Sequence, residues 1–98
     1  MTYQNEIKLL RNQVEHVVTK ISKIIDNVTQ KEFEKRGITN DFIKNNHERF
    51  NVVVYQEADS TERSYYLDGK HLFNVNSTIF YGEESITLQI FVKEGDKT

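Results

Sequence analysis

The side chains that could do chemistry in this chain are three histidines, a loop of carboxylates and a few serines. His16, His47 and His71 are scattered, and no two have the spacing that would bring both imidazoles to one metal ion. The absence of cysteine removes thiolate zinc sites, disulfides and thiol nucleophiles together. No serine has a Gly-x-Ser-x-Gly context, and the glycines are too isolated to cradle a phosphate. We therefore expect no catalytic residue, no cofactor, no metal and no enzyme activity.

The closest group of carboxylates is formed by Glu57, Asp59 and Glu62. Paired carboxylates can share acid and base work only in a cleft that changes their pKa values. These three surround a predicted loop at 59–62, which indicates a hydrated acidic surface instead. Glu83 and Glu84 are interpreted in the same way, as part of a polar turn.

The charge of the chain is distributed unevenly. Residues 1–50 carry nine Lys or Arg and seven Asp or Glu, whereas residues 51–98 carry four and eight. Direct nucleic-acid binding usually requires a basic patch, and the more aromatic second half is the acidic one, so such binding is disfavoured. The single alanine, the absence of proline and the abundance of Ile, Asn and Lys match AT-rich codons. They suggest a low-GC bacterium or a phage or other mobile element.

Length and hydropathy favour one domain and a cytoplasmic location. Ninety-eight residues suffice for a single α+β domain over 1–98, with a helical part at 1–48, an antiparallel sheet at 50–93 and a flexible tail at 94–98. No segment resembles a signal peptide, and no apolar run approaches the roughly 20 residues that span a bilayer.

A seven-residue apolar repeat predicts a long N-terminal helix over about residues 3–27. Its a and d positions are Ile7, Leu10, Val14, Val17, Ile21, Ile24 and Val28. Val18 and Ile25 widen the stripe, and the neighbouring e and g positions lack the complementary charges of a dimeric zipper. The stripe therefore favours packing on the protein's own sheet, and a helix-mediated homodimer is the alternative.

The end of this helix has two interpretations. Thr29 and Glu32 have the spacing of a capping box, which predicts a break near 26–29 and a second short helix ending before Gly37. The alternative is one helix that continues unbroken to Arg36. A further short helix is predicted at about 40–47.

From Phe50 onward the apolar residues alternate, which predicts an antiparallel meander of four to five strands over about 50–93. The strands are expected at about 50–57, 63–67, 70–75, 78–81 and 86–93. Asp68-Gly69 is a strong signal for a type I′ hairpin turn, and the segment 82–85 is expected to form another hairpin loop. Ile86, Leu88, Ile90 and Val92 are expected to face the helix.

The opposite face of the predicted sheet is also expected to be apolar. Either Phe33, Ile38, Phe42 and Ile43 cover it, or it is an interaction surface. The candidate protein-binding surface consists of aromatic and aliphatic residues flanked by acidic ones: Val53, Tyr55, Glu57, Asp59, Glu62, Tyr66, Leu72, Phe80 and Phe91.

The order of elements, a long helix followed by an antiparallel meander, is similar to cystatin-like and NTF2-like folds, and this likeness implies no activity. Our leading hypothesis is a small non-enzymatic protein that binds an unknown partner protein through the acidic, aromatic side of its sheet. The first alternative is a structural homo-oligomer, such as a homodimer, that is assembled through the helix stripe or the open sheet face. The second is a small-ligand-binding cone between helix and sheet.

Overall fold

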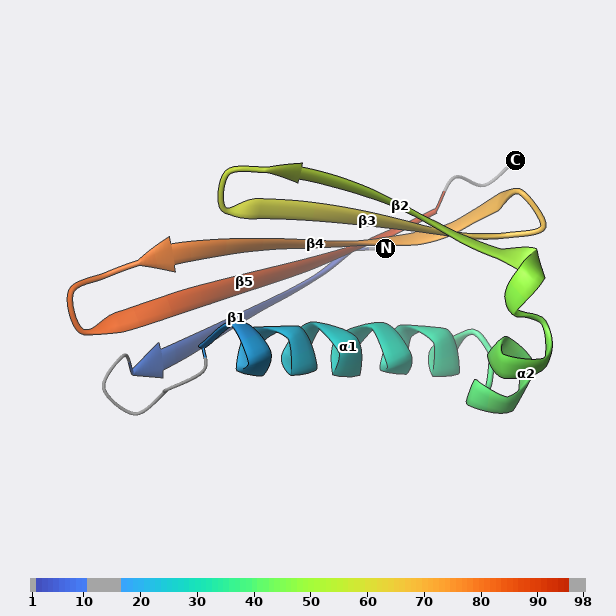
Figure 1. Cartoon of the computed structure of the whole chain (residues 1–98), viewed down its shortest axis with the longest axis horizontal. Helices are drawn as coiled ribbons and strands as arrows, with labels where there is room; N and C mark the ends of the chain where they lie inside the picture. Colours follow the sequence, from blue (N-terminus) through green and yellow to red (C-terminus); the bar gives the residue numbers. More distant parts are fainter. Residues whose placement is uncertain (1, 11–16, 96–98) are drawn as a thin grey trace.

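The computed structural model describes residues 2–10 and 17–95, and it has an α+β fold with one long helix on one face of a five-stranded antiparallel sheet (Figure 1). The predicted fold class is therefore confirmed. The elements in chain order are β1 (Thr2–Leu10), α1 (Val17–Lys35), α2 (Asn40–Asn45), the 3-10 turn η2 (His47–Arg49), β2 (Phe50–Glu57), β3 (Ser60–Leu67), β4 (Lys70–Tyr81) and β5 (Ser85–Glu94).

The sheet has the strand order β1-β5-β4-β3-β2, and its last four strands form the predicted meander. Asp68 and Gly69 have φ angles of 52° and 78°, as a type I′ turn requires. The β2–β3 turn is shorter than the predicted loop at 59–62, because only Ala58 and Asp59 lie between the strands.

β4 is one continuous strand, where two strands separated at Asn76-Ser77 were expected. Asn76 and Ser77 have the composition of a turn, but they pair with β3 on one side and with β5 on the other. Hydrogen bonding to two neighbours thus outweighs their weak strand propensity. β5 extends to Glu94, which was predicted to be the first residue of the flexible tail, and residues 96–98 lie outside the described part of the chain.

The prediction of a helix from residue 3 is wrong for residues 3–10. Thr2–Leu10 form strand β1, which pairs with β5 along its whole length, from Thr2 opposite Lys93 to Leu10 opposite Ser85. The heptad count could not exclude this, because Ile7 and Leu10 are too few to define a period. Pairing with β1 also occupies the side of β5 that faces away from β4. Val14 lies outside the described residues.

The predicted break near 26–29 is also wrong, and the unbroken helix is the correct alternative. α1 continues through this segment to Lys35. The Thr29 hydroxyl donates to the carbonyl oxygen of Ile25 at 2.8 Å, which satisfies it inside the helix instead of at a cap. The helix ends at Lys35, and Gly37 follows it as the predicted C′ residue, with a φ of 75°.

The described part of the helical stripe packs on the sheet, so the predicted intramolecular packing is confirmed there. Ile21 and Ile25 are buried, and Ile24 and Val28 pack against the same core. The sheet contributes five buried side chains: Phe73, Val75, Leu88, Ile90 and Val92. The predicted helix-facing side of β5 is confirmed. Because these side chains are buried within one chain, the described part of the stripe offers little surface for a zipper.

The shorter helical segments extend the core beyond the end of α1. Phe33 belongs to this core. The ring of Phe33 lies edge-on to three other rings, at centroid distances of 5.0–5.9 Å: those of Phe50, Tyr65 and Phe73. Ile38 belongs to the same core, and Phe42 and Ile43 of α2 pack against it. The prediction that Phe33, Ile38, Phe42 and Ile43 cover the opposite face is therefore wrong, because they lie on the helix side.

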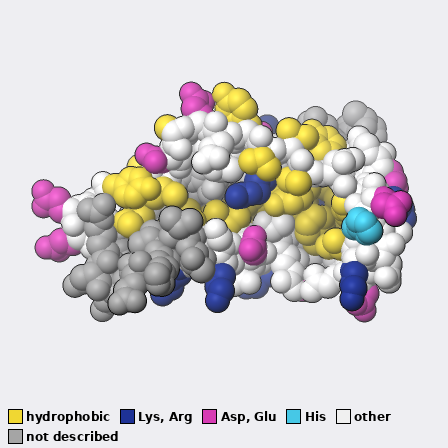
Figure 2. Space-filling model, viewed as in Figure 1, with side chains coloured by type: hydrophobic (Ala, Val, Ile, Leu, Met, Phe, Trp, Pro, Cys, Tyr) yellow, Lys and Arg dark blue, Asp and Glu magenta, His cyan; other side chains and the backbone are white. Residues whose placement is uncertain are grey.

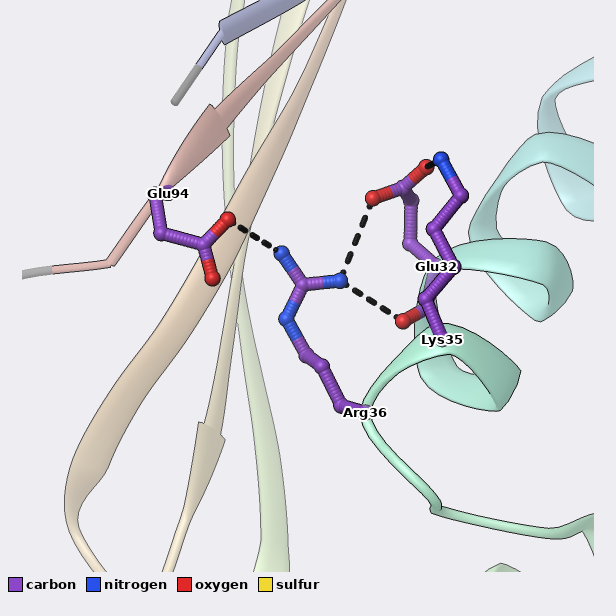
Figure 3. A network of polar contacts seen from close by, with 4 residues as sticks. All are labelled: Glu32, Lys35, Arg36 and Glu94. Atoms are coloured by element: carbon purple, nitrogen blue, oxygen red, sulfur yellow. Dashed lines mark hydrogen bonds and ion pairs between the residues drawn. The ribbon is translucent and has the colours of Figure 1, made fainter.

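An ionic network joins the C-terminal end of α1 to the sheet (Figure 3). The Arg36 guanidinium donates to the Glu94 carboxylate on β5 at 2.7 Å and to the Glu32 carboxylate at 3.1 Å. Lys35 donates to the other oxygen of Glu32 at 3.0 Å. The Glu32 side chain is only 7% exposed, so two cations compensate a nearly buried charge.

Candidate protein-binding surface

The far face of the sheet, which is the face turned away from α1, is polar over its central strands. The ladder places Asn76 opposite Phe91 and Thr78 opposite Gln89, while the alternate pairs Val75–Val92 and Ile79–Leu88 pack toward the helix. The expectation of an apolar far face is therefore wrong for the middle of the sheet. Successive side chains of β4 point to opposite faces of the sheet. In the middle of the strand the apolar side chains therefore point into the core, and the Asn and Thr side chains lie on the far face.

The nine predicted surface residues do not form one patch. Val53 and Tyr55 are exposed on β2, whereas Phe80 and Phe91 are exposed separately on β4 and β5. Tyr66 is half-buried beside the ring of His71, with ring centroids 5.1 Å apart. Leu72 packs against the core, near the irregularity that shifts the β3–β4 register after Tyr65.

Three of the predicted residues do come together at the turn end of the β2–β3 hairpin. Tyr55 lies directly opposite Glu62 in the β2–β3 ladder, and its hydroxyl is 3.5 Å from the carboxylate of Glu57. They line a hollow of about 220 Å³, which we call the acidic hollow. Its other lining residues are Ser60, Thr61, Asn76, Ser77 and Thr78.

Hydrogen bonds hold parts of this hollow in place. The hydroxyl oxygens of Ser60 and Thr78 are 3.1 Å apart, across the β3–β4 ladder. Glu62 accepts from the side-chain amide of Asn74 at 3.2 Å, and Asn74 in turn contacts the imidazole of His71. Asp59 lies in the turn itself, where its carbonyl oxygen accepts from the backbone N–H of Ile79 at 3.0 Å.

The chemistry of the acidic hollow suits recognition more than catalysis. Glu57 and Glu62 are exposed, and no Lys, Arg or His is among the residues that line the hollow. Catalysis by paired carboxylates requires a closed cleft. An aromatic ring beside two uncompensated carboxylates instead provides a surface for a cationic side chain with an aliphatic stem. In Figure 2, acidic and hydrophobic side chains lie next to each other at the upper edge of the molecule, over the part where the hairpin lies.

A second feature of the hairpin is the exposure of β2 on both faces. Seven of its eight residues are exposed, and Val52, Val53, Val54 and Tyr55 are 51–62% exposed. β2 lies at the edge of the sheet, where it pairs with β3, and its first residue, Phe50, contacts Phe33 of α1 while the rest of the strand is exposed (Figure 1). The run of three valines without polar alternation is more typical of strands buried on both faces, so the sequence pattern does not predict this exposure.

Within the described residues there is no group of three or more His, Cys, Asp or Glu side chains that could hold a metal ion. None of the described helices combines the length and apolar character needed to cross a membrane. Comparisons with protein-family models, with curated proteins and with solved structures find no match to this chain.

Proposed function

We propose that the protein is a small non-enzymatic interaction module that binds a partner protein through the acidic hollow of its β2–β3 hairpin. The observation that carries this proposal is the position of Tyr55 between Glu57 and Glu62, with no cation among the lining residues. Charges of one sign left without local compensation select partners of the opposite sign and accelerate their association.

The partner that this surface fits is a protein segment with a Lys or Arg side chain. Its ammonium or guanidinium would lie between the two carboxylates, and its aliphatic stem would contact the ring of Tyr55. Ser60, Asn76 and Thr78 supply polar groups for the backbone of that segment. A ligand-binding cone between helix and sheet has less support, because Phe73, Val75, Leu88 and Ile90 fill that space and are fully buried.

Selection from a displayed library of random peptides tests the proposal without knowledge of the natural partner. We expect the wild-type chain to enrich peptides that contain Lys or Arg, and their affinity to fall as the salt concentration rises. The double variant Glu57→Lys/Glu62→Lys should lose these peptides.

The matched control is Glu83→Lys/Glu84→Lys, which makes the same change of net charge in the exposed β4–β5 turn. It should bind the selected peptides as the wild type does. Equal binding by both double variants, or selection of peptides with no basic residues, would contradict the proposal.

A further inference from the structure

The edge strand β2 lacks the features that normally protect an edge from pairing. Its ladder with β3 runs from Phe50 to Glu57 without a bulge, and no charged residue or proline occurs before Glu57. Natural edge strands are usually short, bulged, charged or covered. The opposite edge strand β1 follows this rule, because it presents Glu6 and Lys8 to solvent.

We propose that β2 pairs antiparallel with β2 of a second copy of this chain, so that the two sheets join into one. The pairing has a two-fold axis perpendicular to the sheet at Val53. Such an axis places residues of the same face opposite each other. Val53 then meets Val53 of the second copy, and Val52 meets Val54 on the other face. The side chains brought together are among the most exposed apolar groups of the described chain.

The charges at the ends of β2 favour this register, because it pairs Arg49 with a carboxylate of the strand itself. Arg49 directly precedes β2 and is held there by Asp68, with 2.7 Å between Nη2 and Oδ2. With the axis at Val53, Arg49 lies next to Glu57 of the second copy, and the two-fold axis repeats this pair at the other end. The registers one step away bring Glu57 to Asn51 or His47 instead. The strand is thus complementary to itself in charge and in apolar surface, which argues for a second copy over an unrelated strand.

Strand pairing uses the backbone edge of β2 and shares Glu57 with the acidic hollow, but Val53 does not line the hollow, so variants at Val53 test the pairing separately. Light scattering over a range of protein concentrations tests it. We expect the wild type to reach the mass of two chains, and Val53→Lys to stay at the mass of one, since it places two like charges on the axis. Phe80→Lys makes the same kind of change at an exposed residue outside β2 and should still dimerise.

Cysteine cross-linking tests the register, and the chain contains no other cysteine. Opposite residues of an antiparallel pair have Cα atoms about 4.5–5.5 Å apart, which a disulfide can bridge. Under oxidising conditions Val53→Cys should form a disulfide-linked dimer, and a reductant should cleave the disulfide. Val54→Cys should form much less, because in this register Val54 lies opposite Val52 and not opposite itself.

Circular dichroism establishes that each variant is folded, and the small change Val53→Cys gives a test that does not depend on Val53→Lys. A wild type with the mass of one chain up to about millimolar concentration would overturn the proposal. So would a dimer that persists in Val53→Lys, and more cross-linking through Cys at 54 than at 53 would overturn the register.

Discussion

Arg36 and Glu94 are 58 residues apart in the sequence, and the guanidinium Nη2 of one lies 2.7 Å from the carboxylate Oε2 of the other. The same guanidinium lies over the ring of Phe73, 4.4 Å from its centroid. Arg36 therefore joins the end of α1 to β4 and β5 through an ion pair and a cation–π contact.

Replacing Arg36 by methionine should destabilise the fold by about 1–3 kcal/mol, because the nearly buried carboxylate of Glu32 loses one of its two cations. The free energy of unfolding in urea measures this. Lys35→Met removes the other cation, whose side chain is 61% exposed, and should cost less than about 1 kcal/mol. Equal costs for the two variants would contradict the larger contribution of Arg36.

Gly37→Ala should destabilise the protein by about 1–2 kcal/mol, because Gly37 has a φ of 75° that a side chain disfavours. The conformation is required by the cap, in which the N–H of Ile38 donates to the carbonyl of Phe33 and the N–H of Gly37 to that of Glu34, both at 3.0 Å. Thermal unfolding measures the loss. Gly37→Asn should cost less, since asparagine tolerates this region better than alanine, and a cost for asparagine as large as for alanine would contradict this explanation.

The hydrogen bond from Arg49 lowers the pKa of Asp68 below its ordinary value, and the positive charge of Arg49 acts in the same direction. A carboxylate with a lowered folded-state pKa stabilises the fold above its unfolded pKa, and this contribution disappears as the pH falls through the folded pKa. NMR titration of the side-chain carboxyl should show the lowered pKa in the wild type. In Arg49→Gln it should return toward the ordinary value of 3.8.

Asp68→Asn is the corresponding stability test, because asparagine retains the tolerance for the φ of 52° that the turn requires. Its stability should fall less steeply than that of the wild type as the pH decreases below about 4. An unchanged acid dependence in this variant would mean that the Arg49–Asp68 pair does not contribute to stability.

Ile7 and Lys8 are neighbours in β1 with different surroundings. Ile7 packs against the core and Lys8 is exposed. Ile7→Asp should cost about 2 kcal/mol or more, since it places a charge against apolar side chains, while Lys8→Asp should change stability by about 0.5 kcal/mol or less. Chemical denaturation compares the two, and similar losses would contradict the packing of Ile7 against the core.

Local patterns predicted much of this fold. The Asp68-Gly69 turn, the alternation in β5 and the helical stripe from Ile21 to Val28 each depend on near neighbours in the sequence, and all three are confirmed. β1 could not be recognised in this way, because its partner lies more than 70 residues away, as in the pair Leu10–Ser85. The pattern around Ile7 does not encode that partner.

The candidate surface was only partly predictable for a related reason. Tyr55, Glu57 and Glu62 come together because a tight hairpin fixes their register locally. Leu72 packs against the core near a register shift that no sequence pattern predicts. The exposure of β2 depends on where α1 ends and which strands it covers, which is a property of the whole molecule.

The pairing of β1 with β5 has a consequence for how the protein folds. β1 precedes its partner β5 in the chain by about 75 residues or more, so it cannot join the sheet until translation has passed residue 94. Contacts between such distant segments slow folding, because a long loop must close before the ladder stabilises it. After β5 is complete and until β1 has joined it, the outer edge of β5 is open to other chains, and the protein is susceptible to aggregation.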